Sequence, residues 1–171
     1  MVLLGAVCGI TGAAFHWCIA YVTELRSENP LIFFLLPFAG LAGVFIYKKL
    51  KVTHVGTMDV LESINFDKPL PARVAAAVFG SSVITYLFGA SCGKEGTALQ
   101  IGSGIAVSIS KAFGLDSKGR KMLTVCGMSA LFSAVFGTPF AAAVFAVEVT
   151  CLKSKELLQS CQWLLPCLCQ V

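Results

Sequence analysis

The chain has 171 residues, of which 57% are hydrophobic and 13% are charged, and its formal net charge is +4. Its mean hydropathy is +0.83, whereas a soluble domain carries roughly 25% charged residues. These values argue against a soluble globular domain, exclude disorder and collagen, and give no support for nucleic acid as a partner. We therefore expect an all-α integral membrane protein surrounded by the lipid bilayer.

Long runs without charge mark the expected membrane segments. A membrane crossing needs about 20 mostly apolar residues. Asp, Glu, Lys and Arg are absent from 1–23, 29–47, 74–93, 96–110, 122–147 and 157–171. The runs 96–110 and 157–171 are the short ones, and the chain end cuts off the helix that the second of them would start.

The N-terminal half predicts two spanning helices and one short helix. Residues 2–24 form the first span, since the run has no basic start typical of a signal peptide. Residues 31–47 form the second span, which Pro37 is expected to kink. Residues 56–66 are too short to cross and begin with Thr57 as an N-cap. Small residues four apart predict a helix-packing stripe on the first span: Gly5, Gly9 and Ala13.

The next two segments each predict a pair of half-helices. Residues 74–89 end at a glycine-rich break, and a second helix runs from near Glu95 to Phe113. Further along, Gly137-Thr138-Pro139 separates helices over 122–136 and 139–150. Two more stripes of small residues follow the same spacing: Gly102, Ala106 and Ser110, and then Cys126, Ala130 and Ala134.

The basic residues predict the topology of these helices. Eleven of them form four clusters, which the positive-inside rule places in the cytoplasm: Lys48, Lys49 and Lys51; Lys68 and Arg73; Lys111, Lys118, Arg120 and Lys121; Lys153 and Lys155. The connection 27–30 then lies outside, and each pair of half-helices enters the membrane and returns. Broken helices at membrane depth are tolerated where they line a cavity enclosed by protein, and they indicate a transporter's binding site.

The segment Gly93-Lys94-Glu95-Gly96-Thr97 is the principal candidate site. It places a carboxylate at the start of a helix, where unpaired N–H groups and the helix dipole favour an anion. A permeating anion can compete with Glu95 for that place, and protonation would vacate it. Glu95 could therefore act as a gate and a proton carrier. The alternative is a buried Lys94–Glu95 charge pair that serves structure alone.

Other chemistry has weaker support in this sequence. A phosphate loop is disfavoured because Gly89 to Lys94 is one residue shorter than the Walker A spacing. No metal site, cofactor or enzyme activity is expected, since no catalytic constellation is visible. His16 is expected to pack between helices or lie at the membrane interface. Three C-terminal cysteines have no His or carboxylate partner: Cys161, Cys167 and Cys169.

Two further positions carry candidate roles. Gly56, Thr57 and Met58 offer N–H groups and a hydroxyl to an anion at another helix start, although these residues by themselves favour an ordinary capped helix. Asp59 and Glu62 suit the dipole of that helix. Glu148 near the end of the helix over 139–150 could hand protons inward or could be a structural acid paired with a basic neighbour.

The order of these motifs resembles the CLC family of chloride channels and anion/proton antiporters. The matching segments are Gly56-Thr57, Gly93 to Gly102 and Phe136 to Glu148. The family's middle signature reads GREGP, where this chain has Lys94 for the arginine and Thr97 for the proline. The resemblance implies a helical fold with two inverted repeats per subunit, two subunits per dimer and one pore in each subunit.

The resemblance also implies roles for individual residues. Glu95 matches the gating glutamate, and Thr57 falls at an anion-coordinating serine. The remaining positions expected at the anion site are Gly56, Gly93, Lys94, Gly96 and Thr97. Glu148 matches the first of two adjacent acids, and Val149 replaces the second, which is the proton-transfer glutamate of antiporters. This difference favours a channel or another proton route.

Chloride is the anion that the resemblance favours, with fluoride exchanged for protons as the alternative, because a bacterial clade of the family exports fluoride. Residues 1–171 resemble only the first repeat, so we expect one membrane domain that is the first half of a longer one, with 151–171 beginning a truncated helix. Its partners would be a second repeat and a second subunit in a bacterial plasma membrane. An inactive fragment or an assembly subunit stays open as another alternative.

Overall fold

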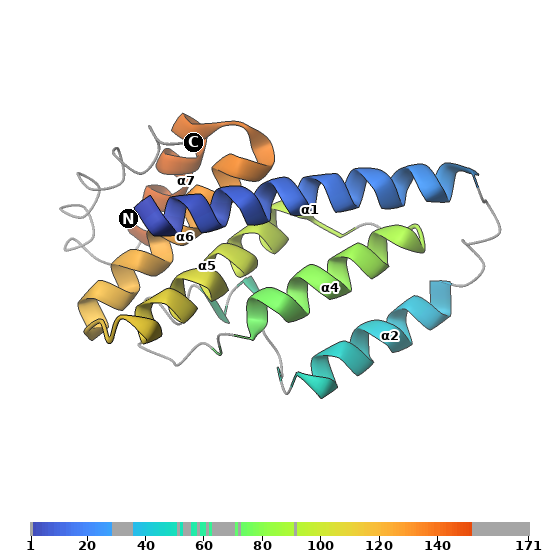
Figure 1. Cartoon of the computed structure of the whole chain (residues 1–171), viewed down its shortest axis with the longest axis horizontal. Coiled ribbons are helices and arrows are strands. Elements are labelled where there is room, and N and C mark those ends of the chain that lie inside the picture. Colours follow the sequence, from blue (N-terminus) through green and yellow to red (C-terminus); the bar gives the residue numbers. More distant parts are fainter. Residues whose placement is uncertain are drawn as a thin grey trace.

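The structure, a computed structural model, describes residues 2–28, 36–50, 52, 56–57, 59–60, 62, 71, 73–90 and 92–151. This part of the chain is helical and contains no strand, which confirms the expected all-α class. Figure 1 labels its helices: α1 (Val2–Glu28), α2 (Leu36–Lys49), α4 (Val74–Leu87), α5 (Lys94–Ala112), α6 (Ser117–Phe136) and α7 (Pro139–Cys151). The expected helix over 157–171 lies outside the described residues.

Helices α4 and α5 form an antiparallel pair, as the break after residue 88 predicts. The chain leaves α4 at Gly89, whose φ of 86° is a conformation that glycine adopts readily. Gly104 of α5 then lies against Ala75 at the start of α4, where an added Cβ would come within 2.8 Å of the Ala75 nitrogen. Figure 1 shows the two helices running side by side in opposite directions. At 14 residues, α4 is too short for a full crossing by itself.

Helices α5 and α6 make the closest approach in the described structure, through a pair of glycines. A Cβ added to Gly127 would lie 2.6 Å from the Gly102 carbonyl oxygen and 2.7 Å from the Ala106 Cβ. Only hydrogen at these positions lets the two backbones come so close. The predicted stripes of small residues on 102–110 and 126–134 therefore do mediate helix packing, because most of their side chains are buried.

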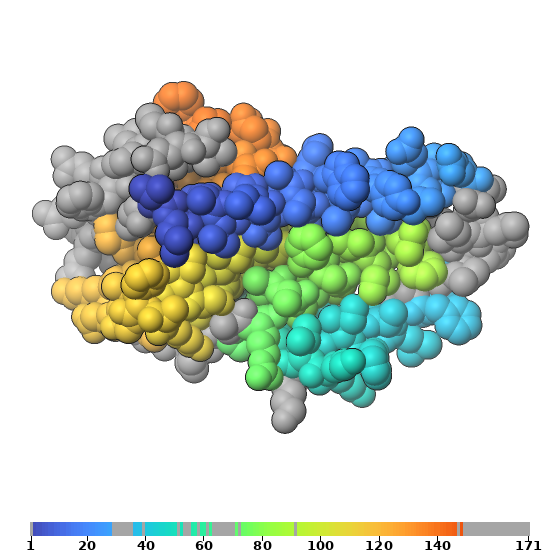
Figure 2. Space-filling model, viewed as in Figure 1, coloured from blue at the N-terminus to red at the C-terminus, as the bar shows by residue number. Residues whose placement is uncertain are grey.

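The small-residue stripe predicted on the first helix is wrong by one position. No atom of another segment lies within 4 Å of a Cβ built on Gly5 or Gly9. The buried stripe of α1 is instead Leu4, Cys8, Gly12, Phe15, Ile19 and Val22. A Cβ added to Gly12 would lie 2.6 Å from the Ala134 Cβ of α6. Figure 2 shows α1 lying along one face of the molecule, over the helices that follow.

Two helix boundaries refine the expected pattern. Helix α6 begins at Ser117, five residues before the predicted start, since Asp116 takes an extended N-cap conformation and the basic residues that follow join the helix. Gly137 ends α6 in a left-handed conformation with φ 66°. Pro139 then begins α7, where its missing N–H costs no helical hydrogen bond. The break predicted at 137–139 is confirmed.

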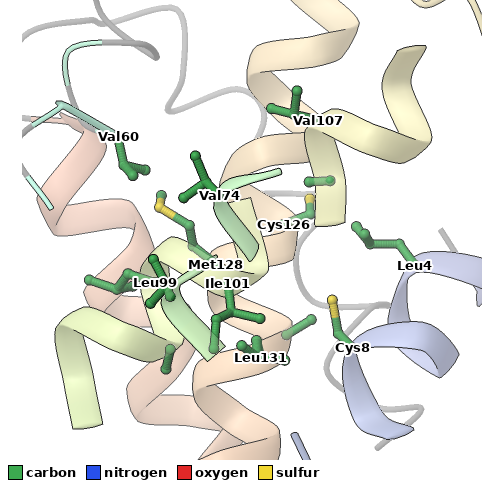
Figure 3. Close-up of a cluster of buried hydrophobic side chains, with 14 of the residues drawn as sticks. Leu4, Cys8, Val60, Val74, Leu99, Ile101, Val107, Cys126, Met128 and Leu131 are labelled. Atoms are coloured by element: carbon green, nitrogen blue, oxygen red, sulfur yellow. The ribbon is translucent and has the colours of Figure 1, made fainter. Parts of the chain in front are cut away.

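One hydrophobic core contains buried side chains of α1, α4, α5, α6 and α7. Figure 3 shows Leu4 and Cys8 of α1 beside side chains of α5 and α6, and the Cys8 thiol lies 3.9 Å from the Gly127 carbonyl oxygen. Several buried hydroxyls bond to the preceding turn, as Ser110 does by donating to the Val107 carbonyl oxygen. Such bonds satisfy polar groups that would be costly to bury unpaired.

Several apolar and aromatic side chains face outward. Among the described helices, Val2–Glu28 is the one that is both long and apolar enough to cross a membrane by length and composition. Trp17 and Tyr21 are exposed on it and stack with ring centroids 6.0 Å apart. His16 is exposed beside them and is not packed between described helices.

Pro37, which was expected to kink the second span, lies in the first turn of the described α2. There it disrupts no hydrogen bond of that helix.

Candidate functional site

The start of α5 provides unpaired backbone donors. Gly93 is the N-cap residue, with an extended conformation (φ −63°, ψ 114°) and no side-chain cap. The first intrahelical bond is donated by the Thr97 N–H to the Gly93 carbonyl oxygen, at 3.3 Å. The N–H groups of the first turn point away from the helix, and the helix dipole adds partial positive charge there. This end of α5 is therefore chemically suited to an anion.

Glu95 lies in that first turn, and its side chain is exposed. Lys94 is also exposed, so the structure does not bury the two residues as a charge pair. The Lys94 ammonium nitrogen lies 5.9 Å from the centroid of the Tyr86 ring, within the range of a cation–π contact. Glu95 is thus the acidic side chain that accompanies the N–H groups of α5, as the sequence predicts.

Thr97 is turned away from the open end of the helix. Its side chain is 4% exposed, and its hydroxyl donates to the Gly93 carbonyl oxygen at 3.0 Å. The same hydroxyl lies 3.3 Å from Ser82 Oγ on α4 and 3.6 Å from Cys92 Sγ. Thr97 therefore holds the first turn of α5 against α4.

A hydrogen bond from α4 fixes the segment that leads into α5. The Tyr86 hydroxyl donates to the carbonyl oxygen of Cys92. This bond ties the last turn of α4 to the residue just before Gly93. The sequence analysis does not single out Tyr86 or Cys92, and the one signal available was their place on either side of the glycine-rich break.

Thr57 lies beside the same end of α5, although 38 residues separate it from Glu95 in the sequence. A Cβ added to Gly96 would come within 3.0 Å of the Thr57 hydroxyl oxygen. The Gln100 side-chain amide donates to that oxygen at 3.3 Å. The structure thus brings together Thr57 and the Gly93–Thr97 segment, two motifs that the sequence analysis placed at one anion site by resemblance.

Gly56 uses its N–H within its own helix start. The Gly56 N–H donates to Asp59 Oδ2 at 2.7 Å, and the Gly56 carbonyl accepts from the Asp59 and Val60 N–H groups. Gly56 is therefore the N-cap, in place of the predicted Thr57, and the Asp59 carboxylate makes the half of a capping box that returns to the N-cap N–H. The Gly56 N–H is satisfied by Asp59 and not left for an anion. Met58 lies outside the described residues.

Glu148 lies on α7, well separated in the chain from the other candidates, and its side chain is exposed. One turn earlier, the Phe145 ring stacks on Phe132 of α6 with centroids 5.3 Å apart. Stacking of these rings fixes the orientation of α7 against α6 and hence the direction in which this turn faces. The role predicted for Glu148, as an inner proton acid or a structural acid, stays a prediction.

The described residues contain no group of three or more His, Cys, Asp or Glu that could hold a metal ion. The cysteines at 161, 167 and 169 lie outside them.

Gln100 also lies at this site, although its place in the Gly93–Gly102 motif predicted no role for it. Its signal was a polar amide inside an otherwise apolar run, four residues after Gly96 and so on the same face of the helix.

Comparisons with known proteins identify the family of this chain. Residues 38–169 match the family model described as voltage gated chloride channel. The chain is 35% identical over 149 residues to a chloride/fluoride channel protein of Pseudomonas syringae pv. tomato, covering 86% of this chain and 33% of that protein. It is 26% identical over 167 residues to the H(+)/Cl(-) exchange transporter ClcA of Citrobacter koseri, covering 85% of this chain and 34% of that one.

A solved structure shows the same fold. The chain superposes with a TM-score of 0.81 and 28% sequence identity on the crystal structure of a CLC-type fluoride/proton antiporter. The match covers 99% of this chain and 42% of the other. The chain therefore spans about a third of the length of the curated relatives and less than half of this structural one.

Proposed function

The chain belongs to the voltage-gated chloride channel (CLC) family, and from this premise we propose that it supplies the first half of a transmembrane anion pathway gated by Glu95. Members of this family are channels or transporters rather than enzymes. Chloride is the proposed anion, and protons are the proposed second species. The proposed setting is a bacterial plasma membrane.

The observation that carries this proposal is the position of Thr57 against the start of α5. A hydroxyl, the first-turn N–H groups and the positive end of a helix dipole converge near Gly96. Together they offer the directed donors that a dehydrated anion needs in place of water. The anion partners proposed here are the Thr57 hydroxyl and the backbone N–H groups of Gly93, Lys94 and Gly96, since the Thr97 N–H already donates to the Gly93 carbonyl oxygen.

The Glu95 carboxylate provides a mechanism for gating at this place. When charged, it can occupy the donors at the start of α5 and exclude the anion. When protonated, it loses its charge and the attraction to those donors. Falling pH therefore favours anion entry, and each opening takes up one proton. Glu148 is a candidate to pass protons inward, although a structural role for it is equally compatible with its exposed position.

The chain corresponds to only part of its structural relative, so the proposed pathway includes further protein. The chain covers 42% of its structural relative, and the backbone at broken helices needs enclosing protein within a bilayer. We propose a second repeat of the same domain as the enclosing part, and a homodimer as the assembly. A piece that inserts without conducting, as an assembly subunit or an inactive fragment, is the outcome expected if that half is absent.

Anion flux from liposomes tests the function. The full gene product that contains these residues is reconstituted, and chloride efflux is measured between about pH 4.5 and 7.5. Glu95→Gln removes the titrating carboxyl group, so we expect the variant's flux to be independent of pH while the parent's flux rises as pH falls. Equal pH dependence in parent and variant would show that Glu95 is not the gate.

Fluoride/proton exchange is the second candidate. It is favoured because one relative is a chloride/fluoride channel protein and the structural relative is a fluoride/proton antiporter. Fluoride binds its hydration water more strongly, so it requires stronger donors than chloride. Parallel flux measurements with each anion separate the candidates, because exchange acidifies or alkalises the lumen in step with the anion and a channel does not.

A further inference from the structure

The Gln100 side chain has no role in the mechanism described so far, yet it contacts the hydroxyl of the proposed site. Its amide nitrogen lies 3.3 Å from Thr57 Oγ1. Its neighbours in the chain, Leu99 and Ile101, are 4% and 1% exposed, so this amide lies at the edge of an apolar core. A half-buried amide in such a setting needs hydrogen-bond partners.

The direction of this hydrogen bond decides what Thr57 can do. A hydroxyl has one proton to donate and two lone pairs that accept. Because Gln100 donates to the Thr57 oxygen, one lone pair is occupied and the hydroxyl proton stays available for another acceptor. Donation from the amide also polarises the O–H bond and makes it a stronger donor.

Gly96 leaves room for the hydroxyl beside α5. Gly96 and Gln100 are four residues apart and share one face of α5. The Thr57 oxygen lies 3.3 Å from the Gln100 amide nitrogen and 3.0 Å from the place that a Cβ on Gly96 would take. The amide therefore holds the oxygen in the space that the glycine leaves, and the hydroxyl proton points away from the lone pair that the amide occupies.

We propose that Gln100 is a positioning residue that sets the Thr57 hydroxyl as a donor to the transported anion. This inference rests on the proposed anion site and extends it to the residue that orients one of its donors. Gln100 acts through Thr57 and does not itself touch the anion.

The test uses flux from liposomes containing the full gene product, with chloride and fluoride as the probes. Gln100→Met keeps the length of the side chain and removes the donor. We expect the anion concentration for half-maximal flux to rise about tenfold, as for loss of one hydrogen bond to a charged group. The maximal rate should change less than about twofold. Ser108→Ala is the matched control, since Ser108 is exposed on α5 and donates to the Gly104 carbonyl oxygen.

A double-mutant cycle separates positioning from a structural effect. In a Thr57→Val background there is no hydroxyl to orient, so we expect Gln100→Met to add no further change. An equal rise in both backgrounds would overturn the proposal, as would a Gln100→Met variant that behaves like Ser108→Ala.

A second variant covers the case in which Gln100→Met does not assemble. Gln100→Glu keeps the shape, but a carboxylate only accepts and would take the Thr57 proton away from the anion. We expect it to raise the half-maximal concentration at pH 7.5, and no change there would overturn the inference. If the parent protein moves neither anion, both the proposed function and this inference fail. If the parent moves an anion and the Gln100 variants leave its flux unchanged, this inference alone fails.

Discussion

Gly96 shows at the level of one residue why the Gly93–Thr97 segment contains a glycine at this position. A Cβ there would lie 3.0 Å from the Thr57 hydroxyl oxygen, closer than ordinary contact. The Thr57 side chain would have to yield, because the Gly96 backbone is fixed by the first turn of α5. The absence of a side chain at position 96 thus keeps the hydroxyl at the start of the helix.

We therefore expect Gly96→Ala to weaken anion flux more than it weakens folding. Displacing the hydroxyl by a few tenths of an ångström spoils a directed hydrogen bond, so flux at low anion concentration should fall severalfold. The thermal unfolding midpoint in detergent should stay within a few degrees of the parent value. Gly40→Ala is the control, since nothing lies within 4 Å of its added Cβ; equal flux in both variants would contradict the assignment.

The sequence predicted which segments lie together better than how their N–H groups are bonded. The resemblance placed Thr57 and Gly96 at one anion site, and the structure brings them together. It could not show that the Gly56 N–H is taken by the Asp59 carboxylate, because a capping box and a free helix start share the same residue types. Gln100 needed the fold, since its partner lies 43 positions away in the chain.

At the level of helices, paired small residues determine which elements can touch. The α5–α6 contact depends on Gly102 and Gly127, whose added Cβ atoms would each meet the other's carbonyl oxygen at well under 3.0 Å. A backbone oxygen cannot move aside as a flexible side chain can. The two helices would have to separate.

We expect Gly102→Ala to lower the free energy of unfolding by about 1–3 kcal/mol, the usual cost of overpacking a close contact. Gly9→Ala is the matched control, because it also adds one methyl group to a helix but meets nothing within 4 Å. It should leave stability unchanged or raise it by less than about 1 kcal/mol. Equal thermal stability of the two variants in detergent would rule out the close crossing.

The helix pattern was predictable where the punctuation is strong. Gly89 and Gly137 both take positive φ angles at predicted breaks, and Pro139 begins a helix as expected. The face of a helix that tertiary packing buries was harder to predict. The spacing of Gly5, Gly9 and Ala13 is the same as that of Leu4, Cys8 and Gly12, the first three residues of the buried stripe beside it.

At the scale of the whole molecule, the polar connections separate to two ends. Figure 1 shows the end of α1 and the α5–α6 connection at opposite extremes of the long axis. Lys111 in the last turn of α5 and Lys118 in the first turn of α6 flank this connection, and both are exposed. This arrangement agrees with the topology predicted from the basic clusters, in which residues 27–30 lie outside and residues 111–121 lie in the cytoplasm.

Labelling of single introduced cysteines in intact cells tests this topology. Ser27 and Lys118 are both exposed, so Ser27→Cys and Lys118→Cys should tolerate a maleimide group. We expect a membrane-impermeant maleimide to label position 27 from outside and position 118 only after the cells are opened. The amount of label on each variant is compared with that on the parent chain under the same treatment. Labelling of position 118 in intact cells would contradict the predicted orientation.

The whole molecule also explains why so many apolar side chains are exposed. Large hydrophobic residues face outward on α1 and α2, among them Trp17 at 71% and Leu41 at 68% exposure. In water such surfaces favour association, but a bilayer or the remaining part of a CLC domain would cover them. The composition predicted this environment, whereas it could not divide these side chains between lipid contact and contact with other protein.

The competition between Glu95 and the anion is tested most directly by equilibrium binding, with chloride and fluoride titrated calorimetrically into the purified full gene product. If the carboxylate occupies the anion's place, Glu95→Gln should bind the anion about tenfold more tightly than the parent at pH 7.5, and the difference should shrink as pH falls and the parent's carboxyl group is protonated. Equal affinities for the two proteins across that range would contradict a shared site at the start of α5.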